Sequence, residues 1–163
     1  MKSRVAYFGV FTALALIFSY VESLIPINFG IPGVKLGLAN LITIVALYKM
    51  GTKEAFILSV TRVVLSGFLF GNLFAILYSM SGAVLSLTVM SLFKKSDKFS
   101  VYGVSMAGGV FHNVGQLVMA MLVVESVSIG GYLPVLLIAG LLTGLMIGIV
   151  SNEILRRLRK LSI

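Results

Sequence analysis

Long apolar runs alternate with short polar or glycine-rich connections along almost the whole chain. A helix that crosses a lipid bilayer needs about 20 consecutive, mostly apolar residues. The pattern therefore predicts an all-α integral membrane protein with six transmembrane helices. The predicted spans are residues 5–25, 34–48, 55–71, 73–93, 101–124 and 132–155.

The connections carry the turn signals expected between such spans. A segment rich in proline and glycine, residues 26–33, follows the first run, and the charged segments 49–53 and 94–98 follow the second and the fourth. Gly71 and Asn72 alone divide the third run from the fourth, and both residue types favour loops over helix interiors. We therefore expect a break at this point rather than one long span.

The first run also resembles a secretory signal peptide. A basic start is followed by an apolar stretch and by Ala13-Leu14-Ala15, which fits an A-x-A cleavage site. The apolar run continues well beyond Ala15, so an uncleaved first span is the favoured interpretation.

Composition supports a single membrane domain. Of the 163 residues, 59% are hydrophobic and 11% are charged, and the mean hydropathy is +1.10. Soluble domains carry roughly 25% charged residues, so this chain cannot cover a water-facing surface. Ordinary soluble enzymes, disordered tails and, because cysteine is absent, disulfide-stapled modules are excluded. Six spans would use about 120 residues, which leaves one domain over residues 1–163.

The positions of lysine and arginine predict the orientation in the membrane. Six spans place both termini on one side, and cytoplasmic loops are enriched in these residues. We therefore expect a multi-pass protein of the cell membrane with both termini in the cytoplasm. Lys35 alone falls on the opposite side, and Arg62 falls inside a span. The net charge of +8 does not indicate a nucleic-acid partner, because the charges sit at span ends and form no stripe. The 11 basic residues on the cytoplasmic side are Lys2, Arg4, Lys49, Lys53, Lys94, Lys95, Lys98, Arg156, Arg157, Arg159 and Lys160.

Arg62 is the most informative polar residue within a span. It lies about eight residues into the third run, and an arginine at the bilayer centre costs at least ~2.5–3.5 kcal/mol on insertion scales. Ser59 and Ser66 share its helical face. The side chain either faces a ligand or is tied to backbone carbonyls or a carboxylate that fixes helix packing.

The fifth span carries a face of small and polar residues. Ser105, Gly108, Gly109, His112 and Gln116 recur at helical spacing, and Asn113 flanks them. The glycines favour close helix approach, and His112 either contacts a ligand or forms a packing hydrogen bond. Without cysteine or a second histidine, no metal, haem or other cofactor is expected.

Further polar residues fall on the outer side of the predicted bundle, and they could converge with Arg62 and His112 on one outward-facing pocket. The balance of Lys35 and Arg62 against Glu22 favours a ligand with an anionic or strongly accepting group. For Glu22 and Lys35, ordinary solvation at the membrane interface is the alternative. The candidate substrate-binding residues are Glu22, Lys35, Asn40, Arg62, Asn72, His112, Asn113 and Gln116.

Small residues four apart mark two helix faces that allow close approach. Gly140, Gly144 and Gly148 form one stripe on the sixth span, and Gly9 and Ala13 form a pair on the first. Such stripes usually serve internal helix packing, and docking of a partner is the other interpretation.

Two segments, residues 28–40 and 108–117, are distinctive. Together with the six-span layout, they resemble the Gx transporter family, which is also catalogued as heptaprenyl diphosphate synthase component I. That family is in turn similar to the substrate-binding S components of energy-coupling factor (ECF) transporters. The resemblance implies a six-helix receptor with an outward pocket, capped by the connection over residues 29–33. It also implies docking, through Gly9 and Ala13, to a coupling subunit driven by two ATPases. Gly9 stands where the usual pattern has alanine.

An enzymatic role is not expected. The chain lacks a Walker A sequence, so it cannot hydrolyse ATP by the usual route. Familiar prenyl diphosphate synthases use aspartate-rich motifs, whereas this chain holds a single aspartate, Asp97. The resemblance therefore implies the binding subunit of an uptake transporter, with a ligand that is unidentified. One alternative is a non-catalytic membrane subunit in isoprenoid or quinone biosynthesis. Another is a purely structural membrane protein whose intramembrane polar residues affect stability alone.

Overall fold

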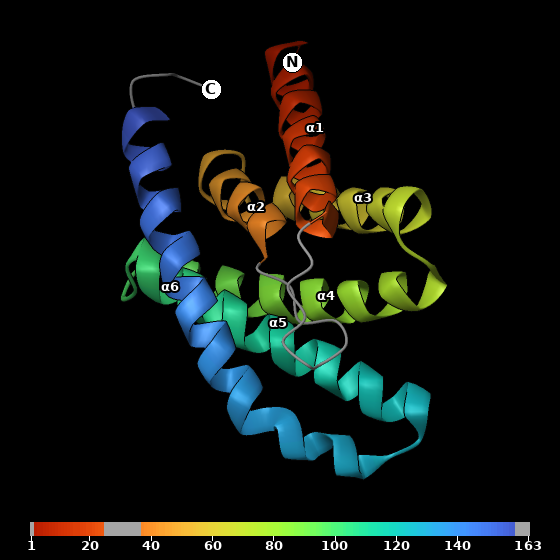
Figure 1. The fold of residues 1–163 in the computed structure, drawn as a ribbon. Helices are drawn as coiled ribbons and strands as arrows, with labels where there is room; N and C mark the ends of the chain where they lie inside the picture. The colour runs from red at the N-terminus through yellow and green to blue at the C-terminus, as the bar shows by residue number, and fades with distance from the viewer. Residues whose placement is uncertain (1, 25–36, 159–163) are drawn as a thin grey trace.

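The computed structural model describes residues 2–24 and 37–158, with side chains from Val5 onward. Six α-helices and one 3-10 helix make up these residues, and no strand occurs among them (Figure 1). The predicted all-α architecture with six helices is therefore confirmed. The helices are α1 (Lys2–Leu24), α2 (Leu38–Lys49), α3 (Thr52–Phe70), α4 (Leu73–Lys95), α5 (Val101–Val124), η1 (Val127–Tyr132) and α6 (Leu133–Leu158).

Helix boundaries follow the expected local signals. The backbone N–H of Gly71 closes the last turn of α3, and the side chain of Asn72 caps α4 by accepting from the N–H of Ala75. Ser100 caps α5 in the same way through the N–H of Gly103. Side-chain oxygens at these positions satisfy N–H groups that have no partner within the helix. The predicted break between the third and fourth spans is confirmed.

Fewer helices are long and apolar enough to span a membrane than the sequence pattern predicts. Four segments are long and apolar enough to cross a bilayer: Val5–Leu24, Leu73–Lys95, Val101–Val124 and Val127–Leu158. The 12-residue α2 rises only about 18 Å, against a hydrocarbon core of about 30 Å. Although α3 has 19 residues, it holds Lys53, Glu54 and Arg62. Of the six predicted transmembrane helices, four are thus candidate spans by length and composition, and the other two, α2 and α3, are shorter or more polar.

The outer surface has the character of a multi-pass membrane protein. Large apolar side chains stand exposed on helices all around the bundle, among them Val10, Phe68, Leu122 and Met146. A water-soluble protein of this size would bury most of these groups. Lipid is the environment that these surfaces fit.

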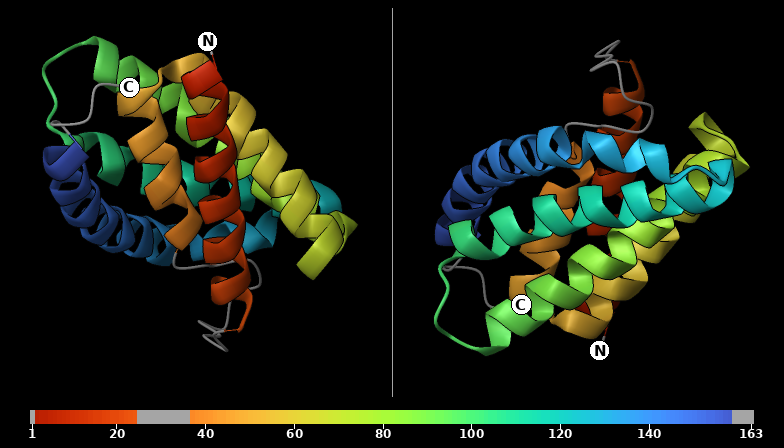
Figure 2. Two further views of the ribbon diagram at one scale, coloured as in Figure 1. Left: turned by 90° about the horizontal axis from the view of Figure 1, so that it is seen from above. Right: turned by 90° about the horizontal axis from the view of Figure 1, so that it is seen from below.

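The helices form two groups. In one, α5 lies between α4 and α6, side by side with both (Figure 2). In the other, α1, α2 and α3 contact one another and cover the first group, with α3 against α4 and α2 against α6. Residues from both groups meet in one core, in which Ile44, Leu47, Leu58, Leu87 and Val104 are fully or almost fully buried.

Glycines let the helices of the first group approach at backbone distance. A Cβ at Gly109 would lie 2.3 Å from the carbonyl oxygen of Gly140, and one at Gly144 would lie 2.7 Å from the Cα of Met106. A Cβ at Gly115 would similarly lie 2.8 Å from the carbonyl oxygen of Ser81 on α4. The stripe on α6 is therefore an internal packing seam, which is the first of the two interpretations of its spacing.

The basic turns gather at one end of the bundle. Nζ of Lys94 donates to the carbonyl oxygen of Leu47, and Nζ of Lys49 donates to that of Leu158, both at 2.5 Å. These bonds join the last turns of α4, α2 and α6, where cations also complement the negative helix ends. The first turns of α1 lie at the same end, and the α3–α4 and α5–α6 connections lie at the other (Figure 2, left). This arrangement agrees with the charge asymmetry along the sequence.

Candidate functional site: a polar cavity between six helices

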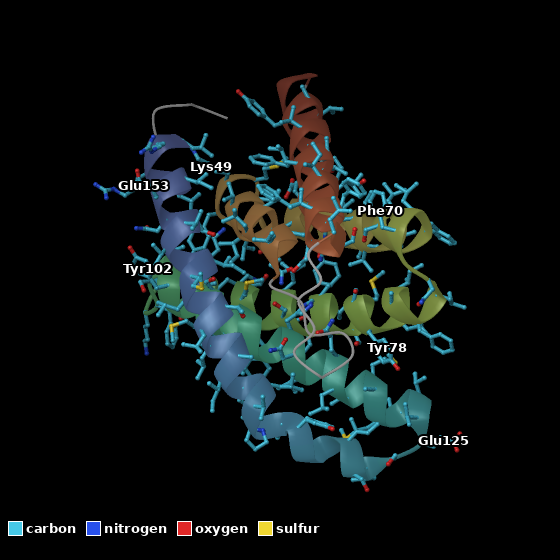
Figure 3. The ribbon with its side chains drawn as sticks, in the orientation of Figure 1. Lys49, Phe70, Tyr78, Tyr102, Glu125 and Glu153 are labelled. Atoms are coloured by element: carbon cyan, nitrogen blue, oxygen red, sulfur yellow. The ribbon has the colours of Figure 1, made fainter. Side chains whose placement is uncertain are left out.

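A polar cavity lies at the junction of the two helix groups. All six α-helices contribute to its wall, and it offers about 60 Å³ to the centres of water-sized molecules. It extends from the helix ends at Ser23, Gly37 and Gly71 to Met90 and Ser105 deep in the bundle. Phe70 in this wall and Lys49 at the basic end are labelled in Figure 3. The cavity therefore reaches the end of the bundle opposite the basic turns.

Arg62 carries a buried charge at this wall. Its side chain stands on the middle of α3 and is 8% exposed. The Nε and Nη2 atoms are buried and have no hydrogen-bond partner within the described residues. The carboxylate of Glu22 attracts the guanidinium electrostatically. A buried donor without a partner forfeits its hydration without compensation, so the burial of these two atoms costs free energy.

Glu22 links α1 to the start of α2. One of its carboxylate oxygens, Oε1, accepts a hydrogen bond from the backbone N–H of Gly37. Gly37 has φ of 74°, and a Cβ there would lie 3.1 Å from Nδ2 of Asn40. A glycine suits both the left-handed conformation and the close approach. The bond holds the ends of α1 and α2 together beside the cavity, with Asn40 one turn further along α2.

The polar face of α5 forms the floor of the cavity. Ser105, Gly108, Gly109, His112 and Gln116 all line it, so the predicted face is oriented toward one space. Two of these side chains pack closely on α4, because a Cβ at Gly82 would lie 2.9 Å from Cγ of Gln116 and 3.0 Å from Cε1 of His112.

Asn113 serves the helix seam as well as the cavity wall. Its Nδ2 donates to the carbonyl oxygen of Leu136 on α6 at 2.8 Å, and the residue is buried. Ser105 does the same through its Oγ, which donates to the carbonyl oxygen of Gly144 at 2.6 Å. These two residues border the cavity, but their bonds fix helix packing.

Most of the candidate residues converge. The six that line the cavity are Glu22, Asn40, Arg62, His112, Asn113 and Gln116. Their convergence is a property of the structure, whereas their role in binding a substrate stays a prediction.

Of the two remaining candidates, the structure describes Asn72. Asn72 is exposed, and its Oδ1 accepts from the N–H of Ala75 at 2.8 Å. Its role here is to cap α4, and it does not face the cavity. Lys35 and the predicted cap over residues 29–33 lie outside the described residues.

Several serines of the cavity wall were not among the predicted site residues. Ser19 and Ser23 flank Glu22 on one face of α1, and Ser79 and Ser86 lie seven residues apart on α4. The i, i+3, i+4 spacing around Glu22 was the signal that could have identified the first pair. Ser86 is occupied by packing, because its Oγ donates to the carbonyl oxygen of Gly108 at 2.8 Å.

The small-residue pair on α1 lies away from the cavity. Gly9 and Ala13 are both exposed, and a Cβ at Gly9 would meet no atom within 4 Å. The pair is not used for packing among the described residues. Partner docking through this face stays a prediction.

Fold and site together define the class of this protein as a multi-pass helical membrane protein with a polar cavity inside its bundle. Residues 11–154 match the family model described as heptaprenyl diphosphate synthase component I, so the chain belongs to that family. No curated protein and no solved structure matches the chain. Among the described residues, no group of three histidine or acidic side chains could hold a metal ion.

Proposed function

We propose that this protein is the membrane-embedded substrate-binding component of an ECF-type uptake transporter, with its ligand bound in the cavity. The observation that carries the proposal is the guanidinium of Arg62, buried at a polar wall with two nitrogens that lack partners within the described residues. Such an arrangement is costly for a purely structural protein. A ligand-binding role for this wall would account for the cost.

The position of the cavity supports uptake from outside the cell. The cavity reaches the bundle end opposite the basic turns, and cytoplasmic loops carry the excess of lysine and arginine. Under the proposal, the basic end and both termini are cytoplasmic, the protein resides in the cell membrane, and the cavity is accessible from the outside.

The partners in this proposal are a membrane coupling subunit and two ATPases. The chain carries no Walker A sequence, so the proposed protein is not an enzyme and needs a separate source of energy. The exposed face of α1 around Gly9 and Ala13 is the proposed contact with the coupling subunit.

The test of this function is whether the protein retains and imports a small molecule. We expect native mass spectrometry of the purified protein to show a bound species, and Gln116→Ala to weaken its retention. Deletion of the gene should lower cellular uptake of the same molecule. Absence of any retained species, together with unchanged uptake across a broad metabolite screen, would contradict the proposal.

A second candidate function is a non-catalytic membrane subunit associated with heptaprenyl diphosphate synthesis. The description of the matching family favours it. The cavity wall does not, since its charged and amide side chains, among them Glu22, Arg62 and Gln116, do not match an apolar prenyl chain. Co-purification with a soluble prenyltransferase, and synthesis that requires both chains, would favour this function over transport. Synthesis that continues without this chain would exclude it.

A further inference from the structure

We propose that the cavity binds an uncharged polar molecule, held by hydrogen bonds from the side chains of Asn40, Ser79 and Gln116. This inference rests on the proposed function, because it specifies the chemistry of the ligand that the cavity would hold.

The first argument is the charge of the wall. Among the described lining residues, Arg62 carries a positive charge and Glu22 a negative one, so with histidine neutral the formal charges sum to zero. The balance that favoured an anionic ligand also counted Lys35, which lies outside the described residues. A ligand with a net charge would have no counter-charge to spare on the described wall, and a buried charge without a counter-charge is costly.

The second argument is that the two charged side chains are occupied with each other and with the fold. The carboxylate of Glu22 attracts the guanidinium of Arg62, and Oε1 of Glu22 accepts from the N–H of Gly37. Arg62 is 8% exposed, and its Nε and Nη2 atoms are buried. The pair therefore presents little hydrogen-bonding surface to a molecule in the cavity.

The third argument is which polar side chains remain available. Asn40, Ser79 and Gln116 line the cavity and are partly exposed, and their side chains make no hydrogen bond to another described residue. On the same wall, the hydroxyls of Ser66 and Thr143 donate to carbonyl oxygens of their own helices. The groups that can bond to a ligand are therefore two amides and a hydroxyl, all of them uncharged.

These three groups come from both halves of the bundle. Asn40 stands on α2, Ser79 on α4 and Gln116 on α5. The two amides pack on glycines, because a Cβ at Gly37 would lie 3.1 Å from Nδ2 of Asn40 and one at Gly82 would lie 2.9 Å from Cγ of Gln116. Each amide offers donors and an acceptor, and the hydroxyl offers both. The ligand class that complements them is a small neutral molecule with donors and acceptors of its own, such as amide or hydroxyl groups.

Identification of the retained molecule is the first test. The species that co-purifies with the wild-type protein is extracted and identified by mass spectrometry, and an uncharged polar molecule is expected. A retained molecule that is an anion, a cation or a zwitterion at neutral pH overturns the inference but leaves the proposed function in place. If the wild type retains nothing, the proposed function fails and the inference fails with it.

Variants of similar shape test the contacts. Asn40→Leu and Gln116→Met remove the amides and keep most of the volume, so we expect each to weaken retention about 5- to 100-fold. Thr143→Val is the matched control, because its hydroxyl is already bonded within α6, and it should retain the molecule as the wild type does. Thermal unfolding shows whether each variant is folded. Undiminished retention by the folded amide variants overturns the assigned contacts.

A further test needs neither the natural ligand nor a functional variant. The wild-type protein is labelled with 15N in nanodiscs, and the side-chain amide signals of Asn40 and Gln116 are assigned by their absence in the two variants. These signals are expected to shift when acetamide, a small neutral probe, is added, and to stay in place with acetate or methylammonium at the same concentration. No response to acetamide, or an equal or larger response to either ion, overturns the inference.

Discussion

The stripe of small residues on α6 and the pair of small residues on α1 have the same spacing but different surroundings. On α6, Gly140 and Gly144 are buried against the backbone of α5, where an added Cβ would lie within 3 Å of main-chain atoms. On α1, Gly9 is exposed, and a Cβ there would meet nothing within 4 Å. Spacing of small residues shows that a close approach is possible, but it does not show which helix makes it.

The polar groups of the two regions differ in the same way. Along α5 and α6, the side chains of Ser105 and Asn113 donate to carbonyl oxygens of the neighbouring helix. Across α1 and α3, Ser19 Oγ and the edge of Arg62 are buried without partners within the described residues. Packing accounts for Ser105 and Asn113, whereas Ser151 Oγ on α6 is also buried without a partner within the described residues. For the groups on α1 and α3, which packing leaves unexplained, we propose a partner subunit and a ligand.

The largest expected effect is that of Gly140→Ala. The added methyl group would lie 2.8 Å from the carbonyl oxygen of Gly109 and 2.8 Å from the Cα of Val110. Because both are backbone atoms, the helices must separate, and we expect unfolding to become easier by about 3 kcal/mol. Thermal and denaturant unfolding in detergent measures this loss. A decrease in the free energy of unfolding below about 0.5 kcal/mol would show that α5 and α6 pack less tightly than in the structure.

The matched control is Gly9→Ala on α1. The same methyl group there meets no neighbour, and alanine has the higher helix propensity by about 1 kcal/mol. The control should be neutral or slightly stabilising. Equal destabilisation by both substitutions would remove the difference between the two stripes.

Arg62→Met has the next largest expected effect, and its sign is opposite. Methionine fills a similar volume and removes two buried donors without partners within the described residues, each of which costs about 1–3 kcal/mol, whereas the carboxylate of Glu22 keeps its hydrogen bond from the N–H of Gly37. We expect the free energy of unfolding to rise by about 2 kcal/mol while ligand retention is lost. The same unfolding assay, run beside native mass spectrometry, measures both quantities. Marked destabilisation would instead support a structural role for the guanidinium.

Much of the fold could be predicted from the sequence, because apolar runs end where charges, caps and glycines begin. The bounds of α5 match the prediction at both ends, since Ser100 caps the helix and Glu125 ends it. Helices α4 and α6 run beyond their apolar stretches, to Lys95 and Leu158. Basic residues are good helix formers and complement the C-terminal end of a helix, so hydropathy alone sets the boundary too early.

The site was partly predictable for a related reason. Arg62, His112 and Gln116 are too polar to face lipid. Their helical spacing was therefore enough to predict that they face the interior of the bundle. Asn72 was assigned to the site because it is polar, but an asparagine immediately before an apolar helix is also an N-cap signal. Ser79 gave no signal, since a serine hydroxyl can bond to its own helix backbone and is therefore neutral evidence.

Gly9→Leu is expected to have the smallest effect on stability and tests what the exposed face of α1 is for. The position is open, so a leucine should change the free energy of unfolding by only a few tenths of a kcal/mol and leave ligand retention intact. Under the proposed function, the bulky side chain blocks close approach of the coupling subunit. Co-purification with that subunit and uptake should both be lost, whereas Val10→Leu, an exposed neighbour on another face, should preserve them. If Gly9→Leu keeps both, the coupling subunit docks elsewhere, and lipid contact alone accounts for the exposed pair. A selective loss would instead show that equal spacing of small residues serves a helix within the chain on α6 and a helix of another subunit on α1.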